Sequence, residues 1–172
     1  MNERTLQRDG VLVEVRDHTR WGANPEAIAD LVALVLRGEG VNAAEVGVGL
    51  VGEAAMRRLN REQRGVDAAT DVLSFPLEEP GEWESPLRSE PGVADLAAQE
   101  PPRLLGDVVL CPRQAVRQAM AEGTPPAFEV ALLLAHGLLH LLGWEHQEWP
   151  GPMALRQGEL LSGFDWTRLA GA

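Results

Sequence analysis

His136-Gly-Leu-Leu-His140-Leu-Leu-Gly143-Trp-Glu-His146 holds three of the four histidines of this chain, within its most apolar region. On a helix, residues four apart lie one turn apart on the same face, so His136 and His140 direct two imidazoles toward one point. Gly143 permits a left-handed backbone that turns the chain back and can return His146 to that point. Three neutral imidazoles with a fourth, open position are the layout of a catalytic zinc site. We therefore predict that these three histidines bind one zinc ion.

A less specific interpretation exists for the first two histidines. His136 and His140 alone would be best explained as core residues hydrogen-bonded to carbonyl groups. The third histidine, after a correctly placed glycine, favours metal binding, because three unpaired imidazoles in an apolar segment are costly to bury. Metal affinity follows the Irving–Williams order, so other divalent transition metals can occupy the same site.

The spacing of the histidines is the one that metzincin proteases use, but one residue type is missing. Those enzymes need a glutamate directly after the first histidine as their general base. This chain has Gly137 there. The sequence thus predicts a metal site without a protease base. Glu145, beside His146, either hydrogen-bonds to a metal-binding side chain and orients it or is a surface carboxylate. The pattern leaves both interpretations open.

The rest of the chain predicts a sheet covered by helices. Alternating apolar residues indicate four strands, at 11–15, 46–51, 71–75 and 105–110. Helical spacing, with proline and glycine at the ends, indicates five helices, at about 24–38, 53–62, 112–121, 124–142 and 153–161. We expect one α+β domain over residues 1–172, with about four strands in a mixed sheet packed with about five helices.

Residues 77–103 differ from the rest in composition. Proline, glycine and acidic residues dominate there. This composition predicts an exposed, acidic loop without a packed core of its own. We find no internal repeat and no other candidate for a linker between domains.

The charge balance argues against generic nucleic-acid binding. Aspartate and glutamate number 26 against 15 basic residues, all arginines, which gives a net charge of −11. A protein that binds phosphates over a broad face is usually basic there, so any positive charge must be local. One candidate is the cluster Arg57, Arg58, Arg61 and Arg64, because guanidinium groups bind phosphate bidentately.

This arginine cluster also has a plain structural interpretation, as a solvated helix face balanced by Glu53, Glu62 and Asp67. Arg64 stands out from the others, because it precedes Gly65 in a turn that leads into the strand at 71–75. Residues at such junctions can reach a cleft. The amino-terminal residues lack an apolar signal sequence, no apolar run is long enough to span a membrane, and one cysteine, Cys111, fits a reducing compartment. We expect a cytoplasmic protein.

The histidine segment resembles the signature of the YbeY family of bacterial endoribonucleases. Two further stretches match in the same order: Asn60 through Arg64-Gly65 to Thr70-Asp-Val-Leu-Ser-Phe-Pro76, and Leu105-Gly-Asp-Val-Val-Leu-Cys111. The closing helix, with Met153 and Glu159, is also similar to the family. The family's signature usually ends Gly-Tyr-Asp-His, whereas this chain has Trp144 and Glu145 before His146.

The resemblance implies more than the residues alone. It implies a YbeY-like metallohydrolase domain, an α+β sandwich with the metal site in a cleft, whose three signature histidines bind zinc and whose functional arginine is Arg64. It further implies cleavage of single-stranded RNA, with roles in maturation of the 16S rRNA 3′ end and in ribosome quality control. The net charge of −11 would then be explained by work docked on a ribosome or on ribosome-associated proteins.

Two other functions stay open at this point. One is a metallohydrolase of another substrate class, such as peptides or small molecules, and the other is a non-catalytic ribosome assembly factor stabilised by its metal. The residues do not choose between water and the 2′-hydroxyl of the RNA as the nucleophile. They also leave open the RNA sequence preference, the physiological metal and the oligomeric state.

Overall fold

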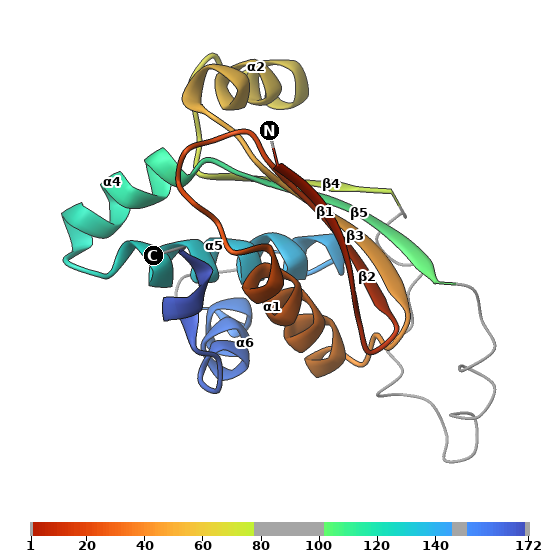
Figure 1. Ribbon diagram of the computed structural model, residues 1–172. Helices are drawn as coiled ribbons and strands as arrows, with labels where there is room; N and C mark the ends of the chain where they lie inside the picture. The colour runs from red at the N-terminus through yellow and green to blue at the C-terminus, as the bar shows by residue number, and fades with distance from the viewer. Residues whose placement is uncertain (1, 78–101, 146–150, 171–172) are drawn as a thin grey trace, which may run out of the picture.

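A computed structural model describes residues 2–77, 102–145 and 151–170 of the chain (Figure 1). Of the predicted features, most of the acidic loop at 77–103 lies outside these ranges, and so does His146.

The centre of the fold is a mixed sheet with the strand order β1-β2-β3-β5-β4. β1 and β2 pair antiparallel, β2, β3 and β5 run parallel, and β4 closes the other edge antiparallel to β5. The strands are β1 (Asn2–Arg8), β2 (Val11–Asp17), β3 (Ala44–Leu50), β4 (Val72–Pro76) and β5 (Arg103–Leu110).

This sheet has one strand more than the approximately four that the sequence predicted. The additional strand is β1, Asn-Glu-Arg-Thr-Leu-Gln-Arg, whose side chains are mostly exposed. An edge strand that is polar on both faces lacks the alternation of apolar residues by which strands are recognised. It is held by the hairpin that connects it to β2, whose alternate residues are buried.

Five α-helices lie within the described residues, in agreement with the number predicted. They are α1 (Pro25–Gly38), α2 (Glu53–Arg64), α4 (Pro112–Glu122), α5 (Pro126–Leu141) and α6 (Pro152–Leu161), and a short 3-10 helix, η2 (Trp166–Leu169), follows them. The predicted start of α1 is confirmed, because the side-chain oxygen of Asn24 accepts hydrogen bonds from the backbone of Glu26 and Ala27. None of the described helices has the length and apolarity needed to cross a membrane.

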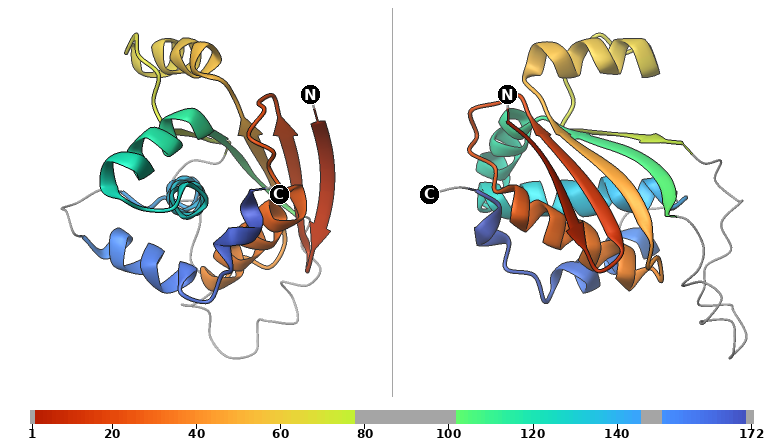
Figure 2. Two further views of the ribbon diagram at one scale, coloured as in Figure 1. Left: turned by 60° about the vertical axis from the view of Figure 1, so that its left-hand side comes forward. Right: turned by 45° about the vertical axis from the view of Figure 1, so that its right-hand side comes forward.

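The helices lie on both faces of the sheet. α1 and α5 cover one face, with α6 packed against these two helices, and α2 lies on the other face (Figures 1 and 2). The alternation along β4 explains this arrangement: Val72 and Ser74 face Gly137 of α5, whereas Leu73 packs in a separate apolar cluster with Met56 of α2. β4 is therefore covered by different helices on its two faces.

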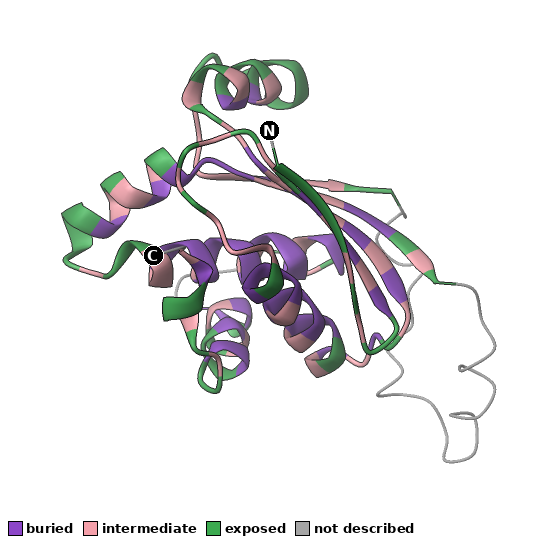
Figure 3. Ribbon diagram, viewed as in Figure 1, coloured by how far each residue is buried: buried purple, intermediate pink, exposed green. Residues whose placement is uncertain are grey.

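Helix α5 is the most enclosed element of the structure. It packs against β4 and β5 on one side and against α1, α4 and α6 on others, and most of its residues are buried (Figure 3). Its partly exposed positions include Leu132, His136 and His140, which are spaced four apart and form one stripe along the helix. The two histidines thus occupy the accessible stripe of an otherwise buried helix.

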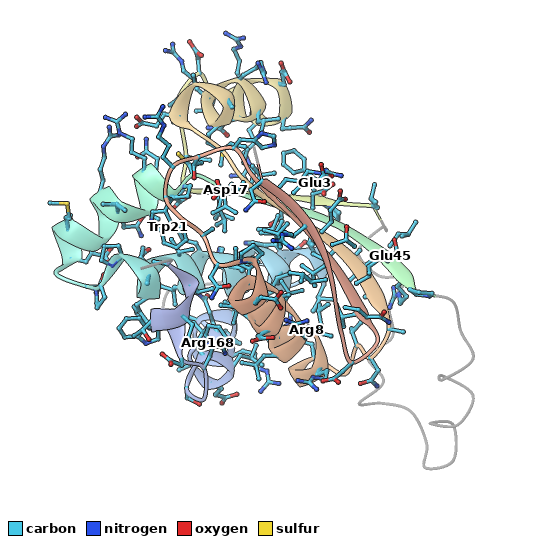
Figure 4. All side chains as sticks on the ribbon, viewed as in Figure 1. Glu3, Arg8, Asp17, Trp21, Glu45 and Arg168 are labelled. Atoms are coloured by element: carbon cyan, nitrogen blue, oxygen red, sulfur yellow. The ribbon has the colours of Figure 1, made fainter. Side chains whose placement is uncertain are left out.

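Charged residues join the edge strand and the C-terminal part of the chain to α1. Arg8 and Arg168, both labelled in Figure 4, hydrogen-bond to Asp30 of α1 at 2.6 and 2.7 Å. Partial burial raises the pKa of the Asp30 carboxyl, but the hydrogen bonds from the two guanidinium groups outweigh it and hold the pKa below its ordinary value. β1 and η2 are in this way tied to the same helix.

Glu129 is a buried carboxyl on α5. Its side chain is 1% exposed, and neither oxygen has a hydrogen-bond partner among the described residues. Burial raises the pKa of this carboxyl, and the negative charges of Glu122 and Asp71 raise it further. The folded protein therefore favours the protonated form of Glu129, and the group destabilises the fold once the pH rises above the ordinary pKa of glutamate.

We predict that Glu129→Gln increases the free energy of unfolding near pH 7, because it removes a carboxyl group whose ionised form is disfavoured by burial and by the charges of Glu122 and Asp71. Because the folded pKa is raised, the destabilisation by Glu129 is absent below about pH 4 and grows as the pH rises. Urea unfolding of both proteins near pH 4 and near pH 7 measures the difference. A gain that is equal at the two pH values would contradict the assignment.

Candidate functional site

The two histidines of α5 meet through their outer ring nitrogens. The Nε2 atoms of His136 and His140 lie 3.1 Å apart, and the ring planes are almost perpendicular, with centroids 4.7 Å apart. The predicted convergence of these two imidazoles on one point is therefore present in the structure. The four-residue spacing on the accessible stripe of α5 produces it.

The inner nitrogen of His140 is held by the backbone just beyond α5. Gly143 has φ 85°, and the amides of Gly143 and Trp144 bond back to the carbonyls of His140 and Leu139. This glycine-terminated end of the helix brings the Trp144 carbonyl to 2.7 Å from His140 Nδ1. A carbonyl oxygen can only accept, so Nδ1 carries the proton and Nε2 carries the lone pair.

The inner nitrogen of His136 is held by a side chain from α6. Gln157 Oε1 lies 3.2 Å from His136 Nδ1, and Gln157 Nε2 donates to the Leu132 carbonyl at 2.7 Å. The bond to Leu132 decides which end of the amide is which, because only the NH₂ group can donate there. The amide oxygen thus faces His136, so Nδ1 of His136 donates and its Nε2 also carries the lone pair.

When both rings are neutral, two lone pairs that face each other at 3.1 Å repel unless a cation, either a proton or a metal ion, lies between them. Tetrahedral zinc with bonds of about 2.0–2.1 Å separates two nitrogen ligands by about 3.3 Å. The imidazole pair therefore fits a shared metal ion in both distance and tautomer. Within the described ranges no three His, Cys, Asp or Glu side chains form a complete ligand set, and the third predicted ligand, His146, lies outside those ranges.

A buried carboxylate on α1 ties the surroundings of the two imidazoles together. Glu39 is 6% exposed and accepts hydrogen bonds from the Trp144 indole at 2.9 Å and from Arg156 at 2.7 Å. Trp144 supplies the carbonyl that holds His140, and Arg156 precedes Gln157, which holds His136. Glu39 thus anchors Trp144, whose carbonyl orients His140. It also anchors Arg156, the neighbour of Gln157, whose amide orients His136.

Gly137 follows the first histidine and lies against the sheet. A Cβ atom at this position would lie 2.6 Å from Val108 Cγ1 and 3.2 Å from both Ser74 Oγ and Val72 Cγ2. Ser74 Oγ also donates a hydrogen bond to the Gly137 carbonyl at 2.9 Å. The position at which a metzincin carries its general base therefore faces β4 and β5. The glycine is explained by this close packing of helix and sheet, and a longer side chain has no room there.

The arginine cluster of α2 is only partly neutralised. Asp67 pairs with Arg57 and Arg61, and the hydrogen bonds from Arg57 hold the pKa of Asp67 below its ordinary value. Glu53, predicted to balance the same cluster, pairs instead with Arg113 and Arg117 of α4. This leaves Arg58 and Arg64 without an ion pair to another described residue.

Arg64 is the last residue of α2, which ends at Gly65. Its side chain is exposed, and α2 lies on the face of the sheet opposite α5 (Figure 2). The structure therefore brings His136 and His140 together. It places Arg64 at the end of α2, on the opposite face of the sheet, with the edge strand β4 between that helix and α5. A role for Arg64 beside the histidines stays a prediction.

The sequence reasoning missed two residues of the site, Gln157 and Glu39. The available signal was a polar residue at a core position: Gln157 lies between Met153 and Leu160 on the buried face of α6, and only 5% of it is exposed. Glu39, directly after α1, carried no comparable pattern. Glu145, considered as an orienting residue, is exposed.

Comparisons with known proteins agree with the resemblance of the three sequence blocks. A family model described as Endoribonuclease YbeY matches residues 16–164. A protein named Endoribonuclease YbeY from Moorella thermoacetica is 47% identical over 122 residues, which are 70% of this chain and 72% of that protein. The protein of the same name from Mycobacterium leprae (strain TN) is 39% identical over 137 residues, 79% of this chain and 72% of the relative.

Among solved structures, the solution structure of TM1509 from Thermotoga maritima resembles this chain with a TM-score of 0.53. The two are 23% identical, and the match covers 86% of this chain and 87% of the other. At this identity the likeness concerns the fold alone, and it agrees with the predicted single α+β domain.

We predict that Gly137→Ala lowers the free energy of unfolding by about 1–3 kcal/mol, the usual cost of overpacking a core. The added methyl group would displace Val108 or push α5 from β4. Gly158 in α6 is the matched control, since a Cβ there meets nothing within 4 Å.

Gly158→Ala is expected to stabilise the protein by about 0.5–1 kcal/mol, because alanine loses less backbone entropy in a helix. Thermal and urea unfolding of the two variants measure the contrast. Equal effects of the two substitutions would show that the contact between α5 and the sheet is not tight.

Proposed function

We propose that this chain, which belongs to the endoribonuclease YbeY family, is a zinc-dependent endoribonuclease that cleaves single-stranded RNA. The observation that carries the zinc requirement is the imidazole pair of α5, whose Nε2 lone pairs converge at 3.1 Å while both Nδ1 atoms face acceptors. The RNA substrate is supported by the names of the relatives and by Arg58 and Arg64 of α2, which have no ion pair to another described residue.

His136 and His140 would hold the zinc ion, with His146 as the third ligand. When bound, zinc would supply Lewis-acid stabilisation of the negative charge that develops on a phosphodiester. The residues of this chain contribute the orientation of the ligands: the Trp144 carbonyl and the Gln157 amide hold the two rings with their lone pairs outward. Other divalent transition metals suit the same nitrogen ligands.

Arg64 would bind a phosphate of the RNA. It has no competing carboxylate among the described residues, and a guanidinium group binds phosphate bidentately. Because α2 and α5 lie on opposite faces of the sheet, an RNA strand that reaches both must cross the edge strand β4. Arg58, which likewise has no ion pair within the described residues, extends the same positive surface.

We further propose that the physiological substrate is rRNA, in maturation of the 16S 3′ end and in ribosome quality control, within the cytoplasm. The net charge of −11 supports a protein that works docked on a ribosome or on ribosome-associated proteins, because long-range attraction to RNA would be weak. The free, buried Cys111 fits a reducing compartment.

Two alternatives find less support. A peptidase that uses this helix would need a base at position 137, which faces the sheet. A purely structural metal would be expected to join elements that have little core of their own. Here both described ligands come from one helix, and α6 is already anchored by the buried side chains of Met153, Leu160 and Leu161.

We predict that zinc at about 100 times its dissociation constant adds about 2.7 kcal/mol to the free energy of unfolding of the metal-free protein. His140→Ala should lose most of this gain, whereas His18→Ala should keep it, because His18 is exposed and lies outside α5. Chemical unfolding with and without zinc measures the gain. An equal gain in both variants would contradict the assignment, and unfolding on removal of the metal would support a structural role instead.

We predict that the zinc-loaded protein cuts the single-stranded 3′ extension of an RNA duplex. His140→Ala should abolish the cleavage, and Arg64→Ala should lower kcat/KM by about 10- to 100-fold, the value of a lost charged hydrogen bond. Arg57→Ala is the matched control: it removes the same charge from the same helix, but from a side chain already paired with Asp67. Its kcat/KM should fall less than about 3-fold.

Identically purified variants exclude a contaminating nuclease as the source of cleavage. A KM effect alone for Arg64→Ala would place this residue at a flanking phosphate, and a kcat effect would place it at the scissile one. Equal cleavage by all four proteins, or by none of them, would contradict the proposed nuclease activity.

A further inference from the structure

We propose that Gln157 is a positioning residue for the metal site: its amide sets the tautomer and direction of His136 and thereby the zinc affinity. This inference rests on the proposed zinc function, but it concerns a contact that can also be measured without metal.

The location of Gln157 is unusual for its residue type. It is one of four polar or charged side chains in the described residues that are buried, at 5% exposure, on a face of α6 that otherwise buries Met153, Leu160 and Leu161. Burying an amide costs free energy unless its donors and acceptors find partners. Both hydrogen-bond partners of Gln157 are on α5, so contacts with that helix compensate for the burial of its amide.

Both ends of the Gln157 amide are engaged. Nε2 donates to the Leu132 carbonyl at 2.7 Å, and Oε1 lies 3.2 Å from His136 Nδ1. Leu132 and His136 are one turn apart on the same stripe of α5, so one amide spans both. A rotation of the amide by 180° would place two acceptors, Oε1 and the Leu132 carbonyl, against each other. The amide therefore has one acceptable orientation, and it enforces a proton on His136 Nδ1.

The two imidazoles are oriented by different means. His140 is held by a main-chain carbonyl, that of Trp144, which exists whatever side chain occupies the position. His136 is held by a side chain, so its orientation depends on the identity of residue 157. In histidine ligands of metals, the group that accepts the second ring N–H fixes the ring and raises its basicity. Of the two groups that orient the imidazoles, the Gln157 amide is therefore the one that a substitution can remove.

The neutral amide also suits an anionic substrate. A carboxylate in its place would strengthen the ring as a ligand but would add a negative charge behind the metal. An amide orients His136 without lowering the positive charge available to a phosphodiester. We therefore expect zinc affinity among variants at position 157 to depend on whether the residue has an acceptor for His136 Nδ1, and not on its charge alone.

The test compares zinc affinity, measured by competition with a chromophoric chelator and without RNA, for the full chain and three variants. Gln157→Met keeps the size of the side chain but removes the acceptor, and it should weaken zinc binding by about 10- to 100-fold. Gln157→Glu keeps an acceptor for His136 Nδ1, although it loses the donor to the Leu132 carbonyl, and should bind zinc within about 3-fold of the native protein. Ser74→Ala is the matched control: it removes another side-chain hydrogen bond to α5, at Gly137, and should change the affinity less than about 3-fold.

A second measurement uses the metal-free protein. Nitrogen-15 spectra of the imidazoles above their pKa should show His136 as the Nδ1–H tautomer in the native protein and in Gln157→Glu, and a shift toward Nε2–H in Gln157→Met. Native affinity in Gln157→Met, or an Nε2–H tautomer of His136 in the native protein, would overturn the inference. Absence of zinc binding by the native protein would contradict the proposed function instead, while the tautomers still test Gln157. If Gln157→Met does not fold, the native tautomer and the affinity of Gln157→Glu decide.

Discussion

A helix enclosed by a sheet on one side and by other helices around it must provide partners for its polar side chains, because an unpaired buried polar group costs about 1–3 kcal/mol. Helix α5 is such an element, and its two histidines satisfy this constraint whereas Glu129 does not. Its contact with the sheet is close enough that position 137 has no room for a Cβ. Its imidazoles each have a specific acceptor for the inner nitrogen, and those acceptors come from the chain beyond α5 and from α6. The result is a pair of imidazoles with defined orientations on a packed element.

The edge strand β4 lies between the imidazole pair of α5 and the exposed arginines of α2. Its residues alternate between α5 on one face and α2 on the other, so the imidazole pair and the exposed arginines belong to different layers. This arrangement suits a substrate that is a flexible single strand more than one that is compact, because only an extended chain can bend around a sheet edge and contact both faces. In the proposed function the exposed arginines would bind the RNA backbone, on a surface where the carboxylate of Asp67 is already paired with Arg57 and Arg61.

The sequence predicted much of this fold and part of the site. Four strands and five helices were recognised, because their apolar spacing and their prolines and glycines are local signals. β1 was missed, since a polar edge strand has no such pattern and is held by pairing with β2. The meeting of His136 and His140 was predictable from a spacing of four residues on a helix, and the turn at Gly143 from its residue type. Gln157 carried a signal as a polar residue at a core position of α6, but its contact with His136, like the contact of Glu39 with Trp144, depends on the docking of distant segments and was not predictable.

The central claim is that α5 supplies two nitrogen ligands to one zinc ion, and X-ray absorption at the zinc edge tests it most directly. The account predicts a first shell of nitrogen and oxygen atoms at about 2.0–2.1 Å. It also predicts the outer-shell scattering of three imidazole rings in the zinc-loaded protein, and a loss of imidazole scattering in His140→Ala. A first shell that lacks imidazole, or one that is unchanged in His140→Ala, would contradict it.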